Sequence, residues 1–272
     1  MNVILCSGMM RSGSTWSFNA ARAVAYIAAE SVGLPFAAMY LDGDSLDSFL
    51  AERVAVPGVV VIKSHSVTPY ALGLAQADQA RNICTFRDPR DSVASRQLFK
   101  DETLSDSITQ VRASVAPMFA FSEETLFVDY QDVMTRPAWA VGRIGDYLSV
   151  QLGETYHQVI ADELSIEKMD AVSDATSGID PTYQLHHNHI HGGKIGRWEE
   201  ELSAGDRSRV CAELSREIDL YETLRANGAR HASVSNRSDG GPQEVESGHR
   251  YRDRNRLVLG EAQPGGADRA RA

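Results

Sequence analysis

Glycine, hydroxyl and arginine side chains are concentrated directly after the first apolar run of the chain. Residues 7–16 read Ser-Gly-Met-Met-Arg-Ser-Gly-Ser-Thr-Trp and follow the apolar residues 3–6. Gly8 and Gly13 let the backbone approach a ligand closely, and the N–H groups at the start of a following helix attract negative charge. Arg11 adds a permanent positive charge with several donors. The pattern predicts a loop that binds phosphate or a related anion; a glycine-rich turn that only begins a helix is the alternative.

This loop lacks the lysine of nucleoside-triphosphate enzymes. Gly8, Gly13 and Thr15 fit the Walker A pattern G-x-x-x-x-G-K-[ST], but Ser14 occupies its lysine position. Because that lysine contacts the β- and γ-phosphates, its absence argues against a kinase. A small-molecule or nucleoside kinase is nevertheless the main alternative among enzymes, and a non-catalytic nucleotide-binding protein of the same fold is the second alternative.

A second candidate anion site follows the apolar run 81–86. Arg87 comes directly after this run, and Ser95 follows eight residues later, on a helix that begins near Pro89. A guanidinium and a hydroxyl together suit a phosphate monoester. A surface ion pair between this arginine and a nearby aspartate is the alternative.

Lys63-Ser64-His65 follows a third apolar run, residues 59–62. A neutral imidazole, whose unperturbed pKa is about 6.5, can take a proton from an attacking hydroxyl or amine. An ammonium beside it can stabilise negative charge on a leaving group. We therefore interpret His65 as a general base and Lys63 as an electrostatic catalyst. A structural histidine at a strand end is the alternative.

Alternating strands and helices position these polar segments. Apolar runs predict strands at 3–6, 36–41, 59–62, 81–86 and 126–129, and amphipathic stretches predict helices at 14–30, 46–54, 137–148, 156–169 and 204–226, with Ser45 capping the second. The alternation predicts an α/β protein, namely a P-loop-like three-layer fold with a central parallel sheet flanked by helices. Ligands of such folds bind at the carboxyl ends of the strands, which is where the polar segments lie.

Composition divides the chain into a folded domain, residues 1–230, and a C-terminal tail, residues 231–272. The tail is rich in Ser, Gly, Arg, Asp and Pro and lacks the apolar surface that would offset the entropy of ordering it, so we predict disorder. The net charge of −10 makes nucleic acid and anionic membrane surfaces unfavourable partners. No apolar run reaches the roughly 20 residues of a membrane span, and the cysteines are far apart, which predicts a cytoplasmic protein.

The first loop resembles the 5′-phosphosulfate loop of the cytosolic-type sulfotransferases, which use 3′-phosphoadenosine 5′-phosphosulfate (PAPS). The family pattern P-K-S-G-T-T-W corresponds to M-R-S-G-S-T-W at residues 10–16. Trp16 takes the place of a tryptophan that stacks on adenine in the family. The residues that the resemblance assigns to the phosphosulfate are Arg11, Ser12, Gly13, Ser14 and Thr15. Arg11 would also stabilise the departing 5′-phosphate, so we count it among the catalytic residues.

The other polar segments resemble further elements of this family. Arg87 and Ser95 have the spacing of the arginine and serine that bind the donor's 3′-phosphate. Lys63 and His65 match the family's K-T-H, whose lysine bridges toward the transferred group and whose histidine is the base. Tyr130 resembles a tyrosine that touches the adenine. The resemblance therefore implies one donor bound at two ends.

A glycine-bearing segment near the end of the domain resembles the family's R-K-G-x-x-G-D-W loop, which covers the 3′-phosphate. Residues 191–198 read His-Gly-Gly-Lys-Ile-Gly-Arg-Trp, so Gly193 matches while the basic pair and the aspartate are replaced. We place His191, Gly193 and Lys194 in the predicted donor site. Whether His191, Lys194 or Arg197 supplies the missing positive charge stays open at this point.

The resemblance implies an enzyme that moves a sulfuryl group from PAPS to a hydroxyl or amine of a small-molecule acceptor by in-line displacement. It would release adenosine 3′,5′-bisphosphate (PAP) and need no metal. The histidines at 186–191 are accordingly interpreted as part of a solvated lid, with a metal site as the alternative. Loops at 66–71, 98–106 and 173–189 are expected to surround the acceptor. The identity of the acceptor and the oligomeric state do not follow from the sequence.

Overall fold

A computed structural model gives the fold of the chain and describes residues 3–53, 56–100, 102–121, 125–180, 183–187, 190 and 192–235. The last helix, α12 (Ser215–Ser235), continues past the domain boundary that we predicted at residue 230. The rest of the predicted tail, residues 236–272, lies outside the described residues.

A parallel sheet forms the centre of the fold. Among the described residues its strands are β1 (Val3–Gly8), β2 (Phe36–Tyr40), β3 (Val59–Lys63), β4 (Arg81–Phe86) and β5 (Leu126–Asp129). Their order is β2-β3-β1-β4-β5, and every neighbouring pair is parallel. The carboxyl ends of all these strands therefore meet at one edge of the sheet, and the predicted parallel α/β architecture is confirmed.

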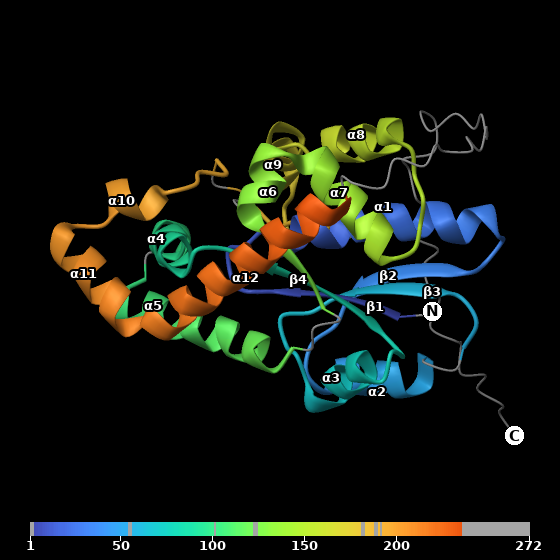
Figure 1. Cartoon of the computed structure of the whole chain (residues 1–272), viewed down its shortest axis with the longest axis horizontal. Helices are drawn as coiled ribbons and strands as arrows, with labels where there is room; N and C mark the ends of the chain where they lie inside the picture. Colours follow the sequence, from blue (N-terminus) through green and yellow to red (C-terminus); the bar gives the residue numbers. More distant parts are fainter. Residues whose placement is uncertain are drawn as a thin grey trace, which may run out of the picture. The chain divides into compact units, whose positions relative to one another are not determined.

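Helices cover both faces of the sheet (Figure 1). They are α1 (Ser14–Ser31), α2 (Asp44–Arg53), α3 (Pro69–Gln76), α4 (Pro89–Lys100), α5 (Leu104–Val115), α6 (Tyr130–Thr135), α7 (Pro137–Tyr147), α8 (Glu154–Glu163), α9 (Ile166–Ala175), α10 (Arg197–Glu201), α11 (Ala204–Glu213) and α12, with a 3₁₀ turn at Ala116–Ala120. α1, α7 and α8 pack on one face, and α2 and α3 pack on the other. The three layers are thus helix, sheet and helix.

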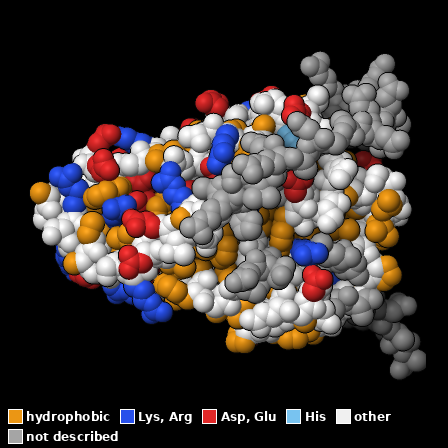
Figure 2. All heavy atoms as spheres, in the orientation of Figure 1, with side chains coloured by type: hydrophobic (Ala, Val, Ile, Leu, Met, Phe, Trp, Pro, Cys, Tyr) orange, Lys and Arg blue, Asp and Glu red, His pale blue; other side chains and the backbone are white. Residues whose placement is uncertain are grey.

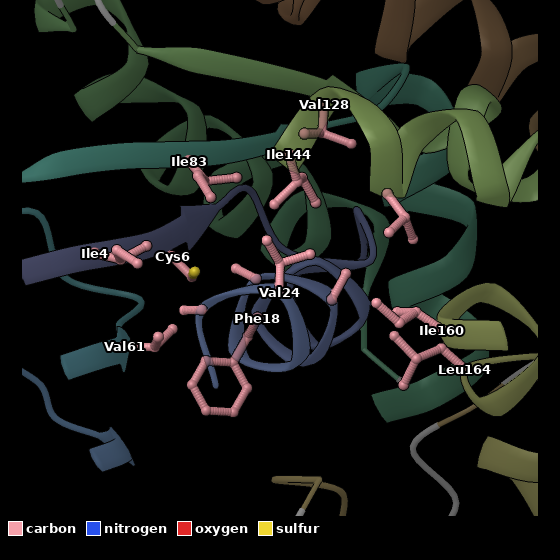
Figure 3. Packing of buried hydrophobic residues seen from close by; sticks show 14 of the residues in the cluster. Ile4, Cys6, Phe18, Val24, Val61, Ile83, Val128, Ile144, Ile160 and Leu164 are labelled. Carbon is pink, nitrogen blue, oxygen red and sulfur yellow. The ribbon is translucent and has the colours of Figure 1, made fainter. Parts of the chain in front are cut away.

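The largest apolar cluster lies around α1 (Figure 3). Phe18 and Val24 project from this helix toward side chains of β1, β3 and β4, and Ile144 of α7 and Ile160 of α8 pack beside them. Successive residues of β1 alternate between the two faces of the sheet, as a strand requires. This packing holds the first turn of α1 rigidly against the carboxyl edge of the sheet, where the anion loop begins.

Three sequence expectations about helices are wrong. The helix predicted at 156–169 is divided into α8 and α9. In one continuous helix Ile160 and Met169 would lie on opposite sides, and the break lets both side chains be buried in the cluster around α1. The helix predicted at 204–226 is divided at Leu214, although its apolar spacing carries no sign of a break. α2 begins at Asp44, so Ser45 lies within its first turn and is not the N-cap.

Candidate active site

The anion loop joins β1 to α1 and is fastened to β4. The buried Ser12 hydroxyl donates to the carbonyls of Met9 (2.7 Å) and Thr85 (3.1 Å) and is hydrogen-bonded to the Thr85 hydroxyl. A Cβ at Gly8 would lie 2.2 Å from that same hydroxyl oxygen, so only glycine fits there. Gly13 at the start of α1 has a φ of +83°, a conformation that favours glycine. The Ser12 side chain therefore supports the loop, and its hydroxyl is committed to protein partners.

A cavity of about 340 Å³ lies against this loop. The predicted site residues that line it are Arg11, Gly13, Ser14, Thr15, Trp16, His65, Arg87, Ser95, Tyr130 and Gly193. Of the loops expected to surround an acceptor, Phe99 comes from 98–106 and His186 from 173–189, and no residue of 66–71 is among the lining residues. The structure thus brings together segments that are up to 180 residues apart in the sequence.

Arg87 connects the anion loop to the glycine-bearing loop near the end of the domain. Its Nη1 donates to the carbonyl of Arg11 (3.2 Å), and its Nη2 donates to Asp91 and to the carbonyl of Lys194. The guanidinium lies 4.2 Å from the centre of the Tyr130 ring. The pair with Asp91 is almost fully buried, so it is not the surface ion pair that the sequence left as an alternative. Nε of Arg87 is buried and has no hydrogen-bond partner among the described residues, which suits a site that receives an anion.

Arg11 and Ser95 meet on the same side of the cavity. Nε of Arg11 donates to the Ser95 hydroxyl at 3.1 Å. The pKa of Arg11 is lowered to about 10, first by burial and also by the positive charges of Arg87, Arg197 and Arg96. Mutual repulsion among buried guanidinium groups is relieved when an anion binds among them. Several guanidinium groups therefore converge beside this cavity although the whole chain is acidic, and carboxylates pair with those of Arg87, Arg96 and Arg197.

Lys63 and His65 stand at the carboxyl end of β3, beside the first turn of α1. The buried Lys63 ammonium donates to the Thr15 hydroxyl at 2.6 Å, and burial lowers the pKa of Lys63 to about 8. Lys63 does not itself line the cavity, but Thr15 and His65 do. His65 is accessible from the cavity, but desolvation by the protein around it, together with the charge of Lys63, lowers its pKa below the ordinary value, so the imidazole is neutral at pH 7.

Two aromatic residues line the cavity next to the anion loop. Trp16 lies in the first turn of α1 and packs against the cluster around that helix. Tyr130 begins α6, and its ring lies so close to Gly13 that an added Cβ would be 3.2 Å away. Trp16 and Tyr130 therefore contribute aromatic side chains to the lining of the cavity, and such side chains can stack on a base.

The segment 192–196 approaches the cavity only through Gly193. Gly193 has a φ of +63°, and a Cβ there would lie 2.2 Å from Cδ1 of Ile166. The Lys194 ammonium pairs with Glu200, and Lys194 does not line the cavity. Arg197 is buried and pairs with Glu201 at 2.9 Å, and its charge acts on Arg11 and Tyr130, although Arg197 does not line the cavity either. His191, the remaining candidate, lies outside the described residues.

No family model and no curated protein sequence matches the chain. Solved structures, in contrast, are similar to the chain. Mouse sulfotransferase SULT7A1 complexed with PAP superimposes with a TM-score of 0.61 at 14% identity, over 85% of this chain and 89% of that chain. The chain has the sulfotransferase fold. Retinol dehydratase is also similar, with a TM-score of 0.54 in its complex with retinol and PAP and 0.53 in its complex with androsterone and inactive cofactor PAP. Both comparisons give 17% identity over 80% of this chain and cover 81% and 80% of the respective structure.

Within this sulfotransferase fold, Asp91 is a site residue that the sequence reasoning missed. Its carboxylate accepts hydrogen bonds from the backbone N–H groups of Gly196 (2.9 Å) and Trp198 (3.1 Å) and from Nη2 of Arg87. Asp91 therefore holds the start of α10 against α4. The only sequence signal was its position four residues after Arg87, which suggested a surface ion pair as the alternative to an anion site.

Asp42 is the second residue that was missed. It follows β2, and its carboxylate contacts the residues after β3, including the backbone N–H of His65 at 2.8 Å. No sequence pattern identified it, because the two segments meet only through the pairing of β2 with β3.

Among the described residues no group of His, Cys, Asp and Glu is arranged to hold a metal ion, and no helix combines the length and apolar character of a membrane crossing.

Proposed function

We propose that this protein transfers a sulfuryl group from PAPS to a hydroxyl or amine of a small-molecule acceptor and releases PAP. The observation that carries the proposal is the convergence of Arg87 and the Arg11–Ser95 pair with the anion loop on one cavity. PAP is present in the similar sulfotransferase and retinol dehydratase structures, and retinol or androsterone accompanies it in the latter. These ligands support a doubly phosphorylated adenosine donor and a small acceptor here.

The cavity walls suit such a donor at both of its ends. The N–H groups at the start of α1, with Ser14 and Thr15, would hold the 5′-phosphosulfate. Arg87 and Ser95 would hold the 3′-phosphate, since guanidinium groups bind phosphate through paired hydrogen bonds. Arg11, which the resemblance assigns to the phosphosulfate, would reach this end as well, because its Nε donates to Ser95. Between these ends, the adenine would lie against aromatic and apolar lining side chains, which are Trp16, Tyr130, Met134, Leu164, Ile166 and Met169.

His65 would act as the general base in an in-line displacement. Its neutral imidazole takes the proton of the acceptor hydroxyl as the acceptor oxygen forms a bond to sulfur. The bond between sulfur and the bridging oxygen of the 5′-phosphate breaks, and PAP departs with the electron pair. Lys63 is protonated at pH 7, because its pKa is about 8, and its ammonium stabilises the charge that develops on that oxygen.

Thermal unfolding with two nucleotides tests the donor. PAP is expected to raise the melting temperature at concentrations where ATP with Mg²⁺ does not, because a ligand that binds only the native state stabilises it. Stabilisation by ATP with Mg²⁺ alone would show that the protein is of the kinase type.

Arg87→Ala tests the phosphate site itself. Loss of two charge-assisted contacts is expected to weaken PAP binding about 100-fold in isothermal titration calorimetry. Arg81→Ala is the matched control, because Arg81 lies at the opposite end of β4 and pairs with Asp78 at the surface. Equal PAP affinities of the two variants would contradict the proposed donor site.

His65→Ala separates an enzyme from a nucleotide-binding protein. The variant is expected to bind PAP normally but to lose PAP release from PAPS by about 100-fold or more in the presence of a panel of hydroxyl and amine acceptors. His157→Ala, on α8 and outside the cavity lining, is the control. If wild type and His65→Ala turn over PAPS equally, His65 is not the base.

A further inference from the structure

Asp42 binds the segment that carries His65 through several hydrogen bonds. One carboxylate oxygen, Oδ1, accepts from the Ser64 hydroxyl (2.6 Å) and from the backbone N–H groups of His65 (2.8 Å) and Ser66 (2.9 Å). The other, Oδ2, accepts from the Tyr40 hydroxyl. Every contact on Oδ1 comes from the three residues that follow β3.

The sheet explains why these residues meet. β2 and β3 are parallel neighbours, with Tyr40 opposite Lys63, so the chain leaves both strands at the same edge. The backbone N–H of Leu41 still donates to the carbonyl of Lys63 at 3.0 Å, which extends the pairing beyond β2. The Asp42 carboxylate therefore lies where it can accept hydrogen bonds from the backbone N–H groups just beyond the end of β3.

The carboxylate is not explained by capping of the following helix. In the first turn of α2 the N–H groups of Leu46 and Asp47 are bonded to the carbonyl of Gly43, and the Ser45 hydroxyl donates to the carbonyl of Asp42. None of these bonds involves the Asp42 side chain, so its Oδ1 is available to accept the hydrogen bonds of residues 64–66.

We propose that Asp42 is the positioning residue of the proposed transfer site. It fixes the backbone of His65, whose side chain lines the cavity, and its carboxylate places a negative charge beside His65 and Lys63. The proposal rests on the proposed function for its role in catalysis, but the contacts that it invokes belong to the protein alone.

The charges around both catalytic groups agree with this role. His65 is faced by the charges of Lys63 and His186, which lower its pKa, and by Asp42, which raises it. Burial lowers the pKa of Lys63, and the negative charge of Asp42 opposes that effect. Burial alone would raise the pKa of Asp42, but its hydrogen bonds keep that pKa below the usual value, so the carboxylate is charged at neutral pH.

Three variants distinguish the two parts of the proposal. Asp42→Ala removes the hydrogen bonds and the charge, whereas Asp42→Asn removes the charge and keeps an oxygen that can accept the N–H groups. Asp44→Asn is the control, because Asp44 is an exposed carboxylate two residues away. Amide hydrogen exchange and the pH titration of the His65 imidazole are followed by NMR in each full-length protein.

In Asp42→Ala, the amide hydrogens of His65 and Ser66 are expected to exchange about tenfold faster than in wild type. In Asp42→Asn, His65 is expected to titrate at a lower pH than in wild type or Asp44→Asn, and the pH–rate profile of PAPS turnover moves to lower pH on both limbs. Unchanged exchange, or identical titrations of Asp42→Asn and Asp44→Asn, overturns the proposal. If Asp42→Ala does not fold, the titration in Asp42→Asn decides.

The exchange and titration measurements need neither donor nor acceptor. A protein that fails to bind PAP while its Asp42 variants behave as expected would contradict the proposed function and leave the placement of His65 by Asp42 intact. A protein that turns over PAPS, but whose pH–rate profile is the same in wild type and Asp42→Asn, would support the proposed function and contradict the role of Asp42.

Discussion

Lys63 shows how a single residue obtains its chemistry from the fold. A lysine in water has a pKa near 10.4, and burial beside α1 brings that of Lys63 to about 8. The ammonium is held by the Thr15 hydroxyl, which lies in the first turn of α1 and lines the cavity. A cation that is desolvated in advance interacts more strongly with an incoming anion, because less water must be displaced.

This pKa gives a prediction for donor binding. Since the pKa of Lys63 is lowered, its positive charge is present below about pH 8 and is lost above it. PAP affinity is therefore expected to fall by about fivefold between about pH 7 and about pH 9.5, as calorimetry would measure. Lys63→Met should bind PAP more weakly at neutral pH and lack this pH dependence. A wild-type affinity that is constant over the range would show that Lys63 does not contact the donor.

At the scale of elements, the glycine-bearing loop and α10 are held to the sheet by Asp91 and Arg87. Asp91 lies in the first turn of α4 and accepts the N–H groups of Gly196 and Trp198, while Arg87 donates to the carbonyl of Lys194. One buried ion pair therefore joins three elements at the cavity. Breaking such a pair on one side leaves a buried charge without its partner, which is strongly destabilising.

Two adjacent glycines of this loop offer a matched comparison. Gly192 and Gly193 both have positive φ, but a Cβ on Gly192 meets nothing within 4 Å, whereas one on Gly193 would overlap Ile166 and Met134. Gly192→Ala is expected to lower the free energy of unfolding by about 1 kcal/mol, from backbone strain alone. Gly193→Ala should lower it by about 2 kcal/mol, because the ends of the Ile166 and Met134 side chains must also move to make room for the methyl group. Chemical denaturation measures both values, and equal losses would show that the loop does not pack as described.

At the scale of the whole molecule, the site depends on apolar clusters on both faces of the sheet. The cluster around α1 supports the anion loop, and a second cluster of β4, α4, α5 and α12 supports Arg87 and Ser95 from the other face. Ionic pairs such as Arg209–Glu213 lie at the surface, and acidic and basic side chains are interspersed over α10 and α11 in Figure 2. The positive charge that would bind an anion is concentrated in the cavity.

Removal of residues 236–272 tests the predicted domain boundary. The composition of this segment predicts that it adds no packed core, so a chain ending at Ser235 should keep its melting temperature within about 2 °C and its PAP affinity within about twofold. A chain ending at Gly228 also loses the last part of α12 and serves as the comparison. A fall of several degrees in the chain ending at Ser235 would show that the deleted residues contribute to the fold.

The sequence by itself determined the local parts of this protein. The β1–loop–α1 unit, the strands that precede Lys63 and Arg87, and the parallel α/β architecture follow from apolar periodicity and from glycine and hydroxyl positions within about 20 residues of each other. Such patterns act over short distances along the chain, so they can be read without knowing which strands are neighbours.

Only the tertiary structure decided which distant residues share the cavity. It paired the Lys194 ammonium with Glu200 and buried Arg197 beside Glu201, and it brought Asp42 and Asp91 to groups that their sequence neighbours do not indicate. The physical reason is the strand order β2-β3-β1-β4-β5, which sets segments far apart in the chain side by side at one edge of the sheet. Hydrogen bonds across that edge depend on how whole helices and strands pack together, and a local sequence pattern does not contain that information.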